Sequence, residues 1–166
     1  MTMTRTEIKA QFGSLLEQAA MSNPHAVEFL LDAFCVAHTW DDLIDRDRPI
    51  SDEDINEAFY TALVKLPRNP FYRQHTDRLG ECLERHVLDW LTTTRWERDP
   101  EMTRQQAEIA WIIRGSYTQL VTETALILGG FGRALAVQDQ VRQIFHHEGI
   151  DGYLQALAME RKVQHG

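Results

Sequence analysis

Helix-breaking residues are few in this chain of 166 residues, and they separate long segments rather than cluster. Only 5 prolines and 9 glycines occur, and apolar residues between them recur with the period of an α-helix. No alternating apolar and polar pattern is long enough to indicate a strand. The sequence therefore predicts an all-α fold, a single-domain bundle of about six to seven helices over residues 1–166.

Capping residues mark where the expected helices begin. Thr4 with Glu7 and Thr103 with Gln106 have capping-box spacing, and Asn23 and Asn69 each precede a proline. We expect helices over residues 4–20, 24–47, 52–66, 70–97, 103–128, 134–147 and 151–163. In this scheme Pro67 ends the third helix and Gly129-Gly130 breaks the fifth.

Composition and charge exclude several classes of protein. Apolar residues make up 43% and charged residues 25%, as in globular domains. The formal charge of -8 repels phosphate backbones, so we expect no nucleic-acid partner. The chain has no evident signal peptide or membrane span, which favours the cytoplasm. Cys35 and Cys82 are expected as buried free thiols.

The segment AHTWDDLIDRDR, in the second expected helix, has the most informative pattern of charges. At roughly 100° per residue, Asp41 and Asp45 fall in the apolar arc of this helix, with His38 beside them. Asp42 falls instead on a narrow polar strip that also contains Asp32. Two buried carboxylates one turn apart need a compensating cation, and Mg²⁺ prefers oxygen ligands. The pattern therefore predicts a magnesium site, unless the face lies in an open groove or arginines neutralise it.

This DDLID sequence resembles the aspartate-rich motif of class I isoprenoid synthases, which are all-α enzymes. In that family the first and last aspartates bind Mg²⁺, which holds the diphosphate of the substrate. The resemblance implies that Asp41 and Asp45 are ligands, with Asp42 in the same motif. It also implies a terpenoid-synthase-like bundle, either as a reduced relative or as a homo-oligomer that builds its pocket between chains.

The same family has a second metal motif, in which an Asn or Asp, a Ser or Thr, and a Glu follow one another at intervals of four. Asp89, Thr93 and Glu97 match that spacing, which places three oxygen ligands along one helical stripe. Further side chains are candidates beside the two motifs. We expect His38 and His86 as extra ligands or partners of ligands, Glu123 as a third carboxylate or as the partner of an arginine, and Arg46, Arg48 and Arg95 as diphosphate-binding residues.

Three functions follow from these features. The first is a Mg²⁺-dependent enzyme, a lyase or transferase that acts on an organic diphosphate. The second is an all-α nucleotide pyrophosphohydrolase, in which Glu81 and Glu84 would join the aspartates. The third is a non-enzymatic interaction or assembly protein, as phages and mobile elements encode, because the chain is short for a terpenoid synthase.

Overall fold

A computed structural model describes residues 5–46, 49–147 and 149–164 of the chain. These residues form helices joined by turns, and none of them forms a β-strand, which confirms the all-α fold. The helices are α1 (Arg5–Ala19), α2 (Pro24–Asp45), α3 (Asp52–Tyr60), the π-helical turn η1 (Thr61–Lys65), α4 (Leu66–Arg68), α5 (Pro70–Gln74), α6 (Thr76–Glu97), α7 (Arg104–Ile113), α8 (Tyr117–Phe145) and α9 (Gly149–Gln164).

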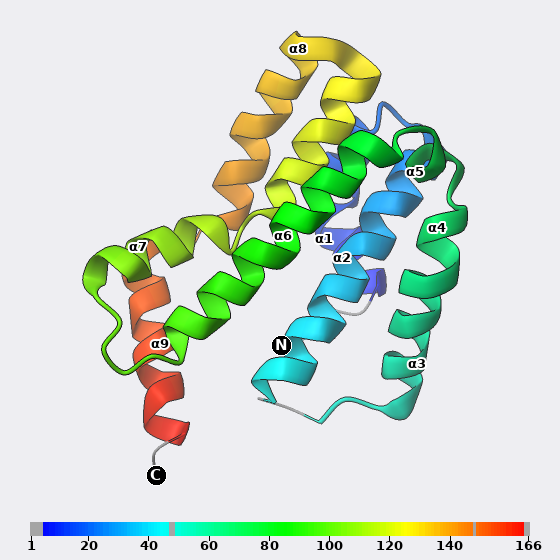
Figure 1. Ribbon diagram of the computed structural model, residues 1–166. Helices are drawn as coiled ribbons and strands as arrows, with labels where there is room; N and C mark the ends of the chain where they lie inside the picture. The colour runs from blue at the N-terminus through cyan, green and yellow to red at the C-terminus, as the bar shows by residue number, and fades with distance from the viewer. Residues whose placement is uncertain (1–4, 47–48, 148, 165–166) are drawn as a thin grey trace.

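The main hydrophobic core lies where α1, α2, α6 and α8 pack together (Figure 1). Phe29, Leu30 and Val121 are completely buried in it. The Tyr117 hydroxyl donates a hydrogen bond to the Leu30 carbonyl at 2.6 Å, which ties α8 to α2. The short helices α3, α4 and α5 run along the side of α2 and connect it to α6 (Figure 1).

A second, smaller core joins α7, α9 and the C-terminal end of α6. Ala107 and Ala110 of α7 pack there against Tyr153 and Leu157 of α9. In Figure 1 α7 and α9 extend to one side of the main bundle, so α6 is shared between the two cores. The region between the cores is where a cavity can form.

The capping predictions are confirmed where the structure describes them. The Asn23 side chain accepts hydrogen bonds from the amides of His25 and Ala26, and Asn69 caps α5 in the same way. Thr103 and Gln106 form the expected capping box at the start of α7. The predicted start of the first helix at Thr4 lies outside the described residues.

The chain does not stop its helix before Pro67, which corrects one prediction. At the end of η1 the Leu66 amide donates its hydrogen bond to the Thr61 carbonyl, five residues back. This turn therefore contains one residue more than an α-helical turn. Pro67 then lies in the first turn of α4, where its missing amide hydrogen costs no helical bond. Local proline rules did not predict this π turn, because such insertions are rare.

Two expected long helices are each divided in two. His75, with φ -125° and ψ 27°, separates α5 from α6, and the turn at residues 114–116 separates α7 from α8. The predicted break at Gly129-Gly130 is confirmed, because Gly130 has φ 73°. The chain reverses there, so α8 forms a helical hairpin (Figure 1).

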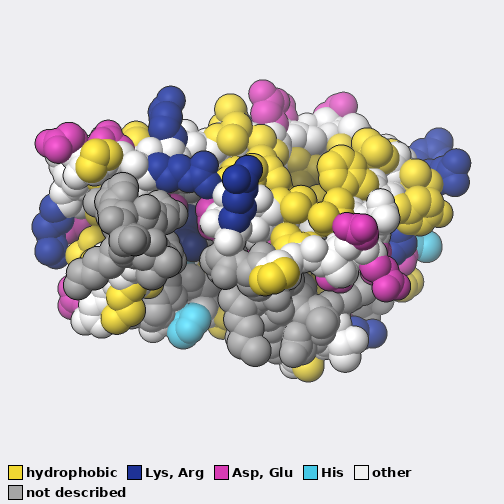
Figure 2. Space-filling model, turned by 90° about the horizontal axis from the view of Figure 1, so that it is seen from below, with side chains coloured by type: hydrophobic (Ala, Val, Ile, Leu, Met, Phe, Trp, Pro, Cys, Tyr) yellow, Lys and Arg dark blue, Asp and Glu magenta, His cyan; other side chains and the backbone are white. Residues whose placement is uncertain are grey.

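Several large apolar side chains remain exposed. Phe59, Tyr60 and Leu63 lie 57 to 71% exposed on α3 and η1, and hydrophobic side chains gather on that side of the molecule in the view from below (Figure 2). By length and composition alone, the helical stretch 104–145 is apolar enough to cross a membrane. The sequence analysis expected no membrane span, whereas the described residues contain one helix that meets this criterion. The core helices of soluble proteins meet the same criterion.

Candidate functional site

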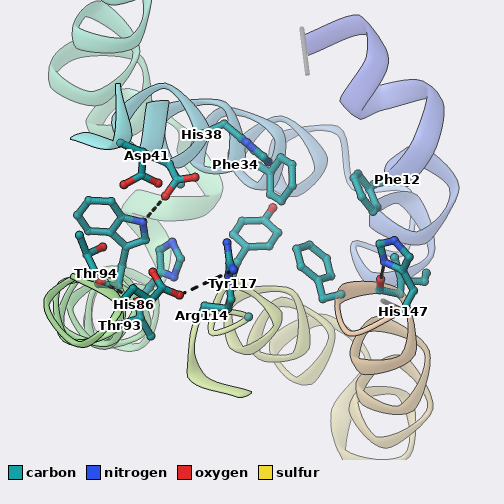
Figure 3. Close-up of a pocket in the computed structure, with 17 residues that line it drawn as sticks. Phe12, Phe34, His38, Asp41, His86, Thr93, Thr94, Arg114, Tyr117 and His147 are labelled. Carbon is teal, nitrogen blue, oxygen red and sulfur yellow. Dashed lines mark hydrogen bonds and ion pairs between the residues drawn. The ribbon is translucent and has the colours of Figure 1, made fainter. Parts of the chain in front are cut away.

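A cavity of about 390 Å³ lies between the C-terminal half of α2, the C-terminal half of α6 and the start of α8 (Figure 3). The cavity has a polar end and an aromatic middle section. Asp41, Thr93 and Thr94 lie together at the polar end, while Phe34 and Tyr117 line the middle section. Charged and polar side chains from two helices thus open onto the same apolar space.

The Asp41 carboxylate is held in place at the polar end by an indole. Trp90 donates a hydrogen bond from Nε1 to Oδ1 of Asp41 at 2.7 Å. The ring of Trp40 packs on Trp90 with centroids 4.1 Å apart. Asp41 therefore lies on the inward side of α2, as the helical wheel predicted, and the two tryptophans support it.

Asp45 lines the same cavity one turn further along α2, but it is more open to solvent. Arg98 approaches its carboxylate at 3.6 Å and also donates a hydrogen bond to the Ile44 carbonyl at 2.8 Å. Both partners of this ion pair are about half exposed, so the pair can separate at little cost in free energy.

Two of the three residues of the second motif reach the cavity. Thr93 and Glu97 line it from α6. The Glu97 carboxylate accepts a 2.7 Å hydrogen bond from the Tyr153 hydroxyl and lies 3.8 Å from Arg114. Arg114 itself lies over the Tyr153 ring, 5.3 Å from its centroid. Glu97 and Arg114 thus join the cavity to the smaller core.

Asp89, the first residue of that motif, is not among the residues that line the cavity. Its partial burial raises the pKa of its carboxyl above the usual value, while the nearby Ser116 hydroxyl and Arg85 act in the opposite direction. The Ser116 hydroxyl also lies 2.8 Å from Nδ1 of His86. Burial lowers the pKa of His86, and the nearby Asp41 acts in the opposite direction. His86, unlike Asp89, faces the cavity.

The polar strip that contains Asp32 and Asp42 is buried at these two residues. The Asp32 side chain lies 3.8 Å from Lys65 of η1. α2 packs against α3 and η1, and the helical wheel alone could not predict this packing. Unlike Asp41, Asp42 is not among the residues that line the cavity.

Glu123 points away from this site, toward α6. It pairs with Arg78 at 2.5 Å, which confirms the prediction of an arginine partner. The expected helix over residues 103–128 is interrupted by the turn at residues 114–116, so residues before and after this turn do not share one helical wheel.

Two of the three expected diphosphate-binding arginines, Arg46 and Arg95, are not at the cavity wall. Arg46 ends α2 in the left-handed conformation, and Arg95 is exposed on α6; neither lines the cavity. Arg48 lies outside the described residues. Two other arginines were not predicted as site residues: Arg98 lies next to Asp45, and Arg114 lies next to Glu97. Arg98 directly follows the second motif in the sequence and Arg114 directly precedes Gly115, and these positions could have indicated them.

The donor set of the cavity fits a hard cation only in part. Asp41, Asp45 and Glu97 provide carboxylate oxygens from two helices, the ligand type that Mg²⁺ prefers. Across the described residues, however, no group of three or more His, Cys, Asp or Glu side chains is arranged to hold a metal ion. Each of the three carboxylates instead has a protein donor, so a cation would have to replace these donors.

No family model matches this chain, and no curated protein or solved structure was found to be similar to it.

Proposed function

We propose that the cavity binds an organic diphosphate together with Mg²⁺ and that the protein acts on the bound diphosphate as an enzyme. The observation that supports this proposal most is that both acidic motifs contribute to one cavity. Asp41 and Asp45 line it from α2, and Thr93 and Glu97 line it from α6. A carboxylate cluster beside an aromatic space suits a ligand with a charged head and an apolar body.

The charges at the polar end require a cation in this proposal. Among the residues that the structure describes, three carboxylates and one guanidinium line the cavity, and a diphosphate alone would be repelled by that balance. Bound Mg²⁺ would offset the negative charge of the diphosphate and of the carboxylates. Arg114 and Arg98 would then exchange their carboxylate partners for phosphate oxygens, which guanidinium groups bind in a bidentate manner.

The aromatic middle section would hold the apolar part of the ligand. Phe34, Tyr117 and Phe145 contribute rings to the cavity wall. Such rings exclude water and stabilise positive charge through their π-faces. A cavity of about 390 Å³ is at the small end of the range for ligand sites, which favours a short apolar body.

A second candidate is the binding of an organic ammonium ion without a metal. The specific observation in its favour is that the carboxylates of the cavity outnumber its guanidinium group beside an aromatic wall. The two other functions predicted from the sequence would use different residues. A pyrophosphohydrolase would use Glu81 and Glu84, which are exposed on α6 and absent from the cavity lining. An assembly protein would instead use the exposed apolar residues of α3.

Thermal melts with Mg²⁺, with pyrophosphate, with both and with neither test the proposal. A ligand at about 100 times its dissociation constant adds about 2.7 kcal/mol, or roughly 5 to 10 °C for a domain of this size. We expect that rise only when both are present. Asp41→Asn should abolish it, while Asp52→Asn, at an exposed site in α3, should leave it unchanged. An equal rise in Asp41→Asn, or no rise in the wild type, would refute the proposal.

A further inference from the structure

The helix formed by α3, η1 and α4 runs along the side of α2, and its outward side carries exposed charged and apolar residues (Figure 1). Phe59, Tyr60 and Leu63 are 57 to 71% exposed, and Glu53 is exposed in the acidic first turn of α3. At roughly 100° per residue, these four side chains fall within about 120° of one another. Thr61, on the opposite side of the helix, is buried. The four residues therefore share one outward face.

The π turn adds Arg68 to this face. In a regular α-helix, Arg68 would lie roughly 130° from the mean direction of the three apolar residues. The additional residue in η1 turns the following part of the helix back by roughly 100°, which leaves Arg68 within roughly 30° of that direction. The same shift places Leu66 on the inner side, where it is buried, while Arg68 is exposed. We call Glu53, Phe59, Tyr60, Leu63 and Arg68 the α3 surface.

The order of charges along the α3 surface indicates the partner that it fits. The surface is acidic at Glu53, apolar in the middle and basic at Arg68. A uniformly basic partner would be repelled by one end, and a uniformly acidic partner by the other. A second copy of the chain that runs antiparallel reverses the order, so unlike charges meet at both ends. Neither Glu53 nor Arg68 has an ion pair among the described residues, so both charges are available to a partner.

The spacing of these residues is also close to symmetric. Phe59 and Leu63 each lie two residues from Thr61. Glu53 lies eight residues before Thr61, and Arg68 lies seven residues after it. A two-fold axis at the level of Thr61 therefore brings Phe59 of one copy against Leu63 of the other. The same axis brings Glu53 against Arg68 at both ends of the contact.

We infer that the protein forms an antiparallel homodimer through the α3 surface. The three apolar side chains of each copy would bury on the order of 300 Å². This area is at the low end for specific interfaces, so the dimer is weak and depends on protein concentration. The residues of the α3 surface do not line the cavity. The inference is therefore independent of the proposed function.

Sedimentation equilibrium of the full chain, from about 10 µM to about 500 µM, measures this association. We expect the mass to rise from that of a monomer toward that of a dimer over this range. Leu63→Asp should keep the protein monomeric, whereas Leu135→Asp, at a site on α8 that is 60% exposed, should leave the dimer unchanged. A wild type that stays monomeric would overturn the inference, even if it bound a basic amphipathic peptide. So would a dimer that persists in Leu63→Asp.

Charge reversal tests the antiparallel arrangement. Arg68→Glu and Glu53→Lys, both at exposed sites, each place like charges at both ends of a homodimer and should weaken it about tenfold. In an equal mixture of the two variants, the heterodimer has unlike charges at both ends. We therefore expect association in the mixture to return to about the wild-type level. A mixture that associates no better than the separate variants would overturn the inference.

Discussion

The two halves of α2 have different surroundings although they belong to one continuous helix. In the first half, Phe29 and Leu30 are completely buried in the main core. In the second half, His38, Asp41 and Asp45 are only partly buried or exposed, and they line the cavity. The helix therefore extends beyond the core that stabilises it, and its free end carries the candidate site.

α6 shows the same division, which explains why the cavity lies between the two cores. Leu79 near its start is completely buried in the main core, while Trp90, Thr93 and Glu97 near its end line the cavity. Residues that stabilise the fold and residues that bind a ligand should therefore lie in different halves of these two helices. Substitutions near the start of α2 should affect stability, and those near its end should affect binding.

The largest expected effect is in the core half of α2. Phe29→Ala should lower the free energy of unfolding by about 3 to 5 kcal/mol, because it leaves a cavity where a buried ring was. His38→Ala, the matched change in the other half, loses an edge contact with Phe34 and should cost about 1 kcal/mol. Urea denaturation measures both. Equal losses would show that the second half is as much a part of the core as the first.

The next effect concerns Asp32, a buried aspartate in the core half of α2. Lys65→Met removes the cation next to the buried Asp32 and should cost about 2 kcal/mol, less than the loss for a fully buried pair, because Lys65 is about one-third exposed. The double variant with Asp32→Asn should recover part of this loss. A stability unchanged by Lys65→Met would mean that other groups neutralise Asp32.

A smaller effect, of opposite sign, is expected at the C-terminal end of α2. Arg46 has φ 55°, a left-handed conformation that favours glycine. Arg46→Gly should raise the free energy of unfolding by about 0.5 to 1 kcal/mol, whereas Arg46→Lys, which keeps a Cβ and the charge, should not. The same variant tests diphosphate binding, because an affinity for Mg²⁺ and pyrophosphate that stays unchanged would exclude Arg46 as a ligand.

The smallest effect is a dependence of stability on pH that originates at His86. Burial lowers the pKa of His86 in the folded protein, so the unfolded chain binds the proton more tightly. The stability that neutral His86 contributes is complete above about pH 6.5, the unfolded value, and is lost as the pH falls toward the folded value. Wild type should lose stability relative to His86→Asn in this window, and denaturation curves at several pH values would show it. Parallel pH profiles would contradict the shift.

Local patterns in the sequence predicted the capped ends of the helices and the reversal at Gly130 well. Asn23, Asn69 and Thr103 form caps through side chains within three residues, so the sequence alone contains the cause. The break at His75 and the π turn before Pro67 were not predictable in this way. They depend on how α3, α4 and α5 fit along α2, which is a matter of tertiary packing.

The candidate site was predictable to a similar extent. Helical spacing brought Asp41 and Asp45 to one face, and Thr93 and Glu97 to another, and the structure places both faces at one cavity. Spacing could not show that Asp42 is buried or that Glu123 pairs with Arg78, because those outcomes depend on neighbouring helices. Assignment of a metal to these residues remains a prediction.

The most direct test of the central claim is paramagnetic broadening of amide signals by Mn²⁺ in the presence of pyrophosphate. If the two motifs share one site, the amides of residues 41–45 and 93–97 should broaden together. The exposed acidic residues Asp52, Glu53 and Asp54 at the start of α3 provide an internal control for non-specific binding and should be unaffected. Broadening confined to α3, or absent from both segments of the cavity, would contradict the account.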